Sequence, residues 1–210
     1  MKDIFGLSIP QNLEEVCDPQ RVALLVYDMQ VGILNQIKNP EQITIQVLKV
    51  LSAARHAGVR VLFSRHLSLP KELMGMSQFR MAMAWQRTDS PEQVKPWFLR
   101  DDPSFQIIPE LAPRPTEGVF DKLTMSAFEG TWLDFALRDC GIKGFIIVGV
   151  ATEIGIEPTI RHGADLGYIP VFVNDACGSG NAEAAQRSIN NIKFIGDALM
   201  TDTETVCSLW

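Results

Sequence analysis

Short apolar runs alternate with longer amphipathic stretches along this chain of 210 residues. Val22–Met29 reads VALLVYDM, a nearly continuous apolar run that is typical of a parallel strand buried on both faces. The stretch from Glu41 to Ala57 places its apolar residues at helical spacing, and Gly58 follows as a stop signal. Repeated along the chain, this alternation indicates βαβ units around a parallel sheet.

The pattern predicts a single α/β domain over residues 1–210, built on a six-stranded, mainly parallel, Rossmann-like sheet. A chain of this length commonly folds as one domain. The predicted strands are Val22–Met29, Arg60–Ser64, Gly118–Leu123, Phe145–Val150, Ile169–Asn174 and Ala198–Thr201. The predicted helices are Glu41–Ala57, Thr131–Cys140, Thr152–Leu166 and Ala182–Phe194.

Residues 67–117 interrupt the alternation, because this segment is too long for a plain connection. Met76, Phe79 and Met83 fall at helical spacing, so part of the segment is predicted to be helical. An apolar insertion of this kind fits a lid over a ligand crevice, a subunit contact, or simple filling of the core. We expect a lid and interface.

Composition narrows the possible partners. The formal net charge is −6 and no run of Lys or Arg occurs, so the chain lacks the electrostatic footprint of a nucleic-acid-binding protein. The N-terminal stretch is polar and is broken by Pro10, unlike a signal peptide, and no apolar run approaches the roughly 18 residues of a spanning helix. We therefore expect a cytoplasmic protein without a membrane partner.

Neither metal nor nucleotide chemistry is indicated. The four cysteines are scattered without a CxxC pair, and the three histidines lack ligand spacing, so reduced thiols and no metal site are expected. The turn after the first predicted strand, DMQVGIL, lacks the glycines that admit a pyrophosphate, and no glycine-rich phosphate loop occurs elsewhere. The sequence predicts no cofactor.

Polar and small residues gather at the predicted strand ends. Asp28, Lys122, Ala151–Gly155 and Asp175–Gly178 each lie at the carboxyl end of a different strand. Because ligands bind outside the carboxyl ends of parallel strands, these four segments predict an active site for a small molecule.

The same segments carry a resemblance to a known family. LLVYDMQ at Leu24–Gln30, FDKLTMSAF at Phe120–Phe128 and the block from Ile146 to Cys177 occur in the order and spacing of the isochorismatase-like hydrolases, also called cysteine hydrolases. The resemblance extends from about Arg21 to Val206. It implies helices on both faces of a six-stranded parallel sheet, assembly as a dimer or tetramer, and a non-proline cis peptide within Val150–Thr152.

The resemblance also implies roles for individual residues. In thiol members, an aspartate matched by Asp28 is the general base, a lysine matched by Lys122 activates a cysteine, and that cysteine attacks an amide or imide. Gly155 stands at the cysteine position here, so no covalent intermediate can form. True isochorismatases also have glycine there, and in them the aspartate protonates a vinyl ether before water adds.

We therefore predict a hydrolase acting on a small, carboxylated molecule without a covalent thiol intermediate. Vinyl-ether hydrolysis is favoured, with a protonated Asp28 as acid/base and Lys122 binding a substrate carboxylate. The alternatives are C–N hydrolysis of an amide or imide with another nucleophile, such as Cys177, and a non-catalytic protein that binds a small molecule or a protein.

Six further residues are predicted to contact substrate, each with a structural alternative. Thr152 also fits a helix N-cap, and Glu153 also fits a carboxylate stabilised by the helix dipole. Trp85 and Phe128 are candidate pocket walls or core residues, and His66 is a candidate contact or an ordinary satisfied histidine. Ala151 completes this set, which the resemblance places beside the catalytic position.

Overall fold

A six-stranded sheet lies at the centre of the computed structural model, which describes residues 1–210. The strand order is β5-β4-β3-β6-β7-β8, and every neighbouring pair is parallel. The strands are β3 (Val22–Tyr27), β4 (Arg60–His66), β5 (Gly118–Lys122), β6 (Gly144–Gly149), β7 (Ile169–Cys177) and β8 (Leu199–Thr201). All six predicted strands and their parallel arrangement are confirmed.

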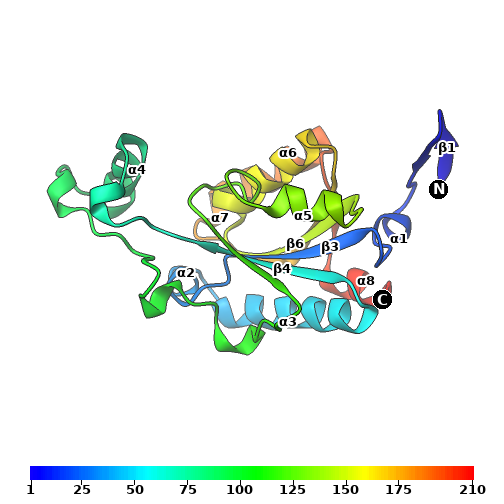
Figure 1. Ribbon diagram of the computed structural model, residues 1–210, viewed down its shortest axis with the longest axis horizontal. Helices are drawn as coiled ribbons and strands as arrows, with labels where there is room; N and C mark the ends of the chain where they lie inside the picture. The colour runs from blue at the N-terminus through cyan, green and yellow to red at the C-terminus, as the bar shows by residue number, and fades with distance from the viewer.

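Helices cover both faces of this sheet (Figure 1). One face carries α3 (Pro40–Ala57) and α8 (Thr203–Ser208), and the other carries α5 (Leu133–Asp139), α6 (Glu157–Asp165) and α7 (Ala182–Ile195). Successive residues of a strand point to opposite faces, so the fully buried strand β3 contributes to both cores. Leu24 and Val26 pack toward α3, whereas Leu25 and Tyr27 pack toward α5 and α6.

Several elements differ from the prediction at their ends. The predicted helix that begins at Thr152 starts with a π-helical turn, Thr152–Ile156, before α6. A short hairpin of β1 (Lys2–Ile4) and β2 (Leu7–Ile9) was not predicted, nor were α1 (Leu13–Val16), α2 (Val31–Leu34) and α8. The hairpin extends away from the sheet, beyond α1 (Figure 1).

The insertion leaves the sheet after β4 and returns to it at β5. Its helix α4 (Met76–Gln86) projects beyond the sheet, and none of its residues is buried (Figure 1). Short 3-10 turns occur at Lys71–Leu73, Pro91–Gln93, Pro103–Phe105 and Pro109–Leu111. The second half of the insertion therefore fills core space, since Phe98, Phe105 and Leu111 are buried. Helix α4 does not, because none of its residues is buried.

None of the helices combines the length and the apolar character that crossing a membrane requires.

Candidate active site

A cavity of ≈320 Å³ lies at the carboxyl ends of the central strands. Asp28 follows β3, His66 ends β4 and Lys122 ends β5, and all three line it. Ala151 and Gly155 come from the turn after β6 and line it as well. Trp85 lines it too, so the structure brings together six of the residues that the sequence predicted for the site.

Asp28 is held by two hydrogen-bond donors. Its side chain is buried, with the residue 4% exposed, and its Oδ1 accepts a 2.6 Å bond from the Ser64 hydroxyl. Its Oδ2 accepts a 2.7 Å bond from Lys122 Nζ, and the two side chains form a buried ion pair. Both carboxyl oxygens of Asp28 therefore accept hydrogen bonds from protein donors. The predicted role of Asp28 as a proton donor does not match this arrangement, in which both oxygens act as acceptors.

Lys122 has no free donor for a substrate. The residue is 2% exposed, and its ammonium also donates to the Thr124 carbonyl at 3.1 Å. The third side of Nζ faces the Tyr27 ring, 4.4 Å from the ring centroid. Burial lowers the pKa of Lys122, and the Asp28 charge opposes this effect. The expectation that Lys122 binds a substrate carboxylate is therefore corrected: its ammonium is committed to Asp28.

Tyr27 fills the space beside Gly155. A Cβ built on Gly155 would lie 2.0 Å from Tyr27 Oη and 2.5 Å from Cζ, well inside any tolerable contact. Tyr27 is buried, and its hydroxyl donates to the Met125 carbonyl. The position where the resemblance places a cysteine thus has no room for any side chain. Tyr27 was not predicted as a site residue, although an aromatic residue in an otherwise aliphatic strand, directly before Asp28, was a usable signal.

The turn after β6 has one free backbone donor at the cavity. The Val150–Ala151 peptide bond is cis, as the resemblance implied. The Ala151 N–H makes no hydrogen bond within the protein, whereas the N–H groups of Ile154, Gly155 and Ile156 all donate to the Ala151 carbonyl. The Ala151 N–H is therefore available to a ligand in the cavity; the Glu153 N–H is also unpaired, but Glu153 does not line the cavity.

Thr152 and Glu153 have structural partners and do not line the cavity. The Thr152 hydroxyl and N–H both donate to the Gly178 carbonyl, at 3.0 and 2.9 Å, so the residue is not an N-cap. Glu153 Oε1 accepts from the N–H groups of Gly180 and Asn181, at 2.8 and 2.6 Å, and thereby fixes the loop before α7. The prediction that these two side chains contact substrate is corrected, because neither lines the cavity. The Thr152 hydroxyl and Glu153 Oε1 hold two loops, while the buried Glu153 Oε2 has no hydrogen-bond partner.

Of the three predicted aromatic or imidazole contacts, only two line the cavity. His66 and Trp85 line the cavity, but Phe128 does not. Phe128 stacks on Tyr168 at a centroid distance of 5.6 Å and packs against Phe145 in the core, so its prediction as a pocket wall is corrected. Burial and the nearby Lys122 charge lower the pKa of His66 to about 4. His66 is therefore a neutral imidazole at neutral pH.

No cysteine can replace the missing thiol. Cys177 is buried in β7, its thiol donates weakly to the Ile147 carbonyl at 3.5 Å, and burial raises its pKa. None of the four cysteines lines the cavity. The alternative of a relocated Cys177 nucleophile is thus inconsistent with the structure. Likewise, the His, Cys, Asp and Glu side chains nowhere form a group of three that could hold a metal ion.

Comparison with known proteins agrees with this fold. The family model of the isochorismatase domain matches residues 22–204, and the chain belongs to the isochorismatase family. It is 29% identical over 204 residues to a ureidoacrylate amidohydrolase of Acinetobacter baylyi, covering 89% of this chain and 82% of that protein. It is 27% identical over 222 residues to the Serratia proteamaculans ureidoacrylate amidohydrolase, covering 96% of this chain and 88% of that protein.

A solved structure supports the same fold and family. A cysteine hydrolase from Pseudomonas syringae pv. phaseolicola superposes with a TM-score of 0.76 at 27% identity, covering 91% of this chain and 92% of that one. The predicted superfamily and fold are confirmed, and the protein is a hydrolase of this family.

Proposed function

We propose that the protein hydrolyses a carbon–nitrogen bond of a small amide or ureide, with a water molecule as nucleophile and Asp28 as general base. The observation that carries this proposal is the Asp28 carboxyl group, held by Ser64 and Lys122 at a cavity where Gly155 stands in place of a nucleophilic cysteine. The amidohydrolase relatives, whose names describe C–N cleavage, support the bond type.

The reaction proceeds in two proton transfers. Asp28 accepts a proton from water as the water oxygen attacks the carbonyl carbon, which gives a tetrahedral intermediate. The C–N bond then breaks, and the leaving nitrogen takes the proton back from Asp28. One water is consumed, and an acid and an amine or ammonia are released, so Asp28 returns to its starting state.

Two groups assist Asp28 in this scheme. The Ala151 N–H is available to donate to the carbonyl oxygen as negative charge develops on it. Lys122 and Ser64 fix the orientation of the carboxylate before water is bound. Lys122 stabilises the base in this role and does not contact the substrate.

Vinyl-ether hydrolysis is the second candidate, and Gly155 favours it, because the resemblance gives true isochorismatases a glycine at this position. That reaction needs a proton on the catalytic aspartate at the start. Asp28 Oδ2 instead accepts from the Lys122 ammonium at 2.7 Å, and Oδ1 accepts from Ser64. We therefore place C–N hydrolysis first.

The test compares two products from the same preparations. Ammonia release from a panel of primary amides and ureides, and pyruvate release from isochorismate, are measured with the natural protein and with Asp28→Asn. We expect ammonia release, reduced about 10²–10⁴-fold in Asp28→Asn because the base is lost. Replacing all four cysteines should leave this rate unchanged. Asp28-dependent pyruvate release without ammonia release would reject the proposal in favour of the second candidate.

A further inference from the structure

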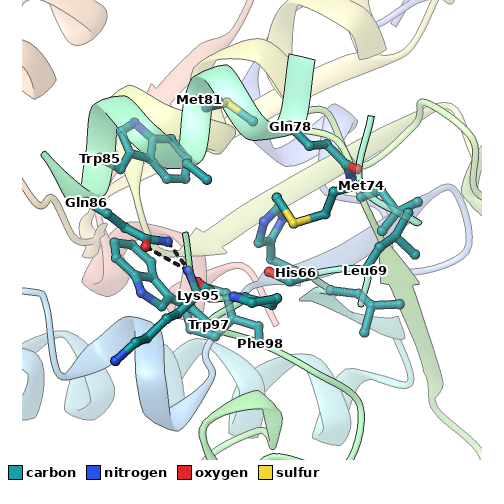
Figure 2. Close-up of a pocket in the computed structure, with 15 residues that line it drawn as sticks. His66, Leu69, Met74, Gln78, Met81, Trp85, Gln86, Lys95, Trp97 and Phe98 are labelled. Carbon is teal, nitrogen blue, oxygen red and sulfur yellow. Dashed lines mark hydrogen bonds between the residues drawn. The ribbon is translucent and has the colours of Figure 1, made fainter. Parts of the chain in front are cut away.

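A narrow apolar crevice lies under α4 (Figure 2) and borders the catalytic cavity. The crevice has a volume of ≈60 Å³ and shares four lining residues with the cavity: His66, Trp85, Trp97 and Phe98. Met74, Met81 and Ala82 line it farther from Asp28. The crevice therefore lies next to the space in which a ligand beside Asp28 would bind.

A pair of hydrogen bonds holds the crevice together. Gln86 Nε2 donates to the Lys95 carbonyl at 2.8 Å, and the Lys95 N–H donates to Gln86 Oε1 at 3.0 Å. These two hydrogen bonds, called the Gln86–Lys95 latch below, connect the end of α4 to the segment that carries Trp97 and Phe98, as Figure 2 shows. Phe98 in turn packs edge-on against His66, with a centroid distance of 5.9 Å. The aromatic walls are thus fixed relative to the catalytic strands.

Neither the cavity nor the crevice has an uncommitted cation. The charged side chains that line them are Asp28, Lys122 and Lys95. Asp28 and Lys122 neutralise each other, and the Lys95 side chain points away from the aromatic walls (Figure 2). His66, with its pKa lowered to about 4, adds no charge at neutral pH. A substrate carboxylate placed here would lose its hydration without gaining a partner.

We propose that the substrate is an uncharged amide or ureide whose short apolar substituent occupies this crevice. This inference rests on the proposed C–N hydrolysis and adds the substrate class. The crevice is small, with a volume of ≈60 Å³, so it suits a short substituent and not a long chain. The uncharged substrate proposed here replaces the carboxylated substrate that the sequence predicted.

Methyl ketones test the crevice without turnover, because a C–C bond replaces the bond to be cleaved. Dissociation constants of acetone, 2-butanone, 2-pentanone and 2-hexanone are measured by NMR titration of the natural protein. We expect affinity to rise about fourfold for each added carbon and to level off once the crevice is filled. The anion 4-oxopentanoate, which has a carboxylate where 2-pentanone has a methyl group, should bind at least tenfold more weakly than 2-pentanone.

Two matched variants on α4 show whether the gain in ketone affinity with chain length arises in the crevice. Ala82→Leu fills the crevice, whereas Ala84→Leu makes the same change at an exposed position outside it. The gain with chain length should disappear in Ala82→Leu and persist in Ala84→Leu, while both variants retain the affinity for acetone.

The inference is overturned by tighter binding of 4-oxopentanoate than of 2-pentanone, by affinities independent of chain length, or by identical behaviour of the two variants. It is equally overturned if none of the ketones binds. The expected ketone profile without any amide turnover would reject the proposed reaction and leave the apolar binding site standing, so the two failures are distinguishable.

Discussion

At the scale of single residues, Tyr27 and Gly155 behave as one unit, because each occupies space that the other leaves. Gly155→Ala would place a methyl group 2.0 Å from Tyr27 Oη. We expect this change to lower the free energy of unfolding by about 1–3 kcal/mol, the usual cost of overpacking, and to impair activity. Gly75→Ala is the control, since a Cβ there meets nothing within 4 Å. Urea unfolding of both variants checks the difference.

A double-mutant cycle shows whether the pair is coupled. Tyr27→Leu removes the atoms that clash with a side chain at position 155, so the cost of Gly155→Ala should shrink in the Tyr27→Leu background. We expect a coupling energy of roughly 0.5–3 kcal/mol in the unfolding free energy. Strict additivity of the two single changes would show that the close contact at Gly155 relaxes elsewhere and that Tyr27 does not exclude a side chain there.

His66 gives the stability a defined pH dependence. Its folded pKa is about 4, below the ordinary value of 6.5, so between these values the unfolded chain binds more protons than the folded one. The contribution of His66 to the free energy of unfolding is therefore fully present above about pH 6.5 and is lost as the pH falls toward 4. We expect a loss of about 2 kcal/mol in unfolding free energy between pH 7 and 4.5. The His66→Gln variant should show a correspondingly flatter profile, and an unchanged slope would contradict the assignment.

The catalytic residues differ in how far the sequence could predict them. Asp28 and Lys122 lie at strand ends, and the rule that parallel strands present their carboxyl ends at one edge was enough to bring them together. The commitment of the Lys122 ammonium was not predictable, because it depends on the 2.7 Å approach of two side chains from β3 and β5, which β4 separates. The roles of Thr152 and Phe128 were missed for the same reason: their partners are distant in sequence.

At the scale of elements, α4 depends on few contacts and should respond strongly to their loss. Gln86→Ala removes both hydrogen bonds to the Lys95 backbone. We expect amide hydrogen exchange in α4 and residues 95–98 to accelerate several-fold while β3 and β6 stay protected, since no residue of α4 is buried. Arg80→Ala, an exposed change on the same helix, is the control. Equal exchange in the two variants would mean that the Gln86–Lys95 latch does not hold the helix.

Periodicity predicted the long apolar runs and missed the short elements. The central strands β3 and β6 are runs of buried apolar residues, which is the signal that the pattern detects. The helices α1, α2 and α8 each bury an apolar residue but are only four to six residues long, too short for a helical period to show. The β1–β2 hairpin consists of two exposed three-residue strands joined through Phe5 and Gly6, both at positive φ. With no buried face, it has no burial pattern to detect. The π-helical turn before α6 was hidden because it shifts the helical register only locally.

At the scale of the whole molecule, large apolar side chains are exposed on several elements, among them the β1–β2 hairpin, α4 and α7. Phe5 in the hairpin is 97% exposed, Met76 at the start of α4 is 81% exposed, and Phe194 near the end of α7 is 88% exposed. A two-stranded hairpin is marginally stable alone in water, and clustered apolar exposure is typical of an association surface. We therefore propose that the protein assembles as a homo-oligomer, a dimer or a tetramer, through α4 or the hairpin.

Light scattering after size-exclusion chromatography tests this assembly. We expect a mass of two or four chains, and a dissociation constant at least tenfold weaker in Met76→Glu or in Phe5→Glu, since burying one such side chain contributes about 1.5–3 kcal/mol. Ser77→Glu adds the same charge at the neighbouring exposed position of α4 and should change the constant less than Met76→Glu does. A monomeric natural protein at micromolar concentration would contradict the proposal. Because Trp85 of α4 also lines the catalytic cavity, dissociation through Met76→Glu should raise KM more than it lowers kcat.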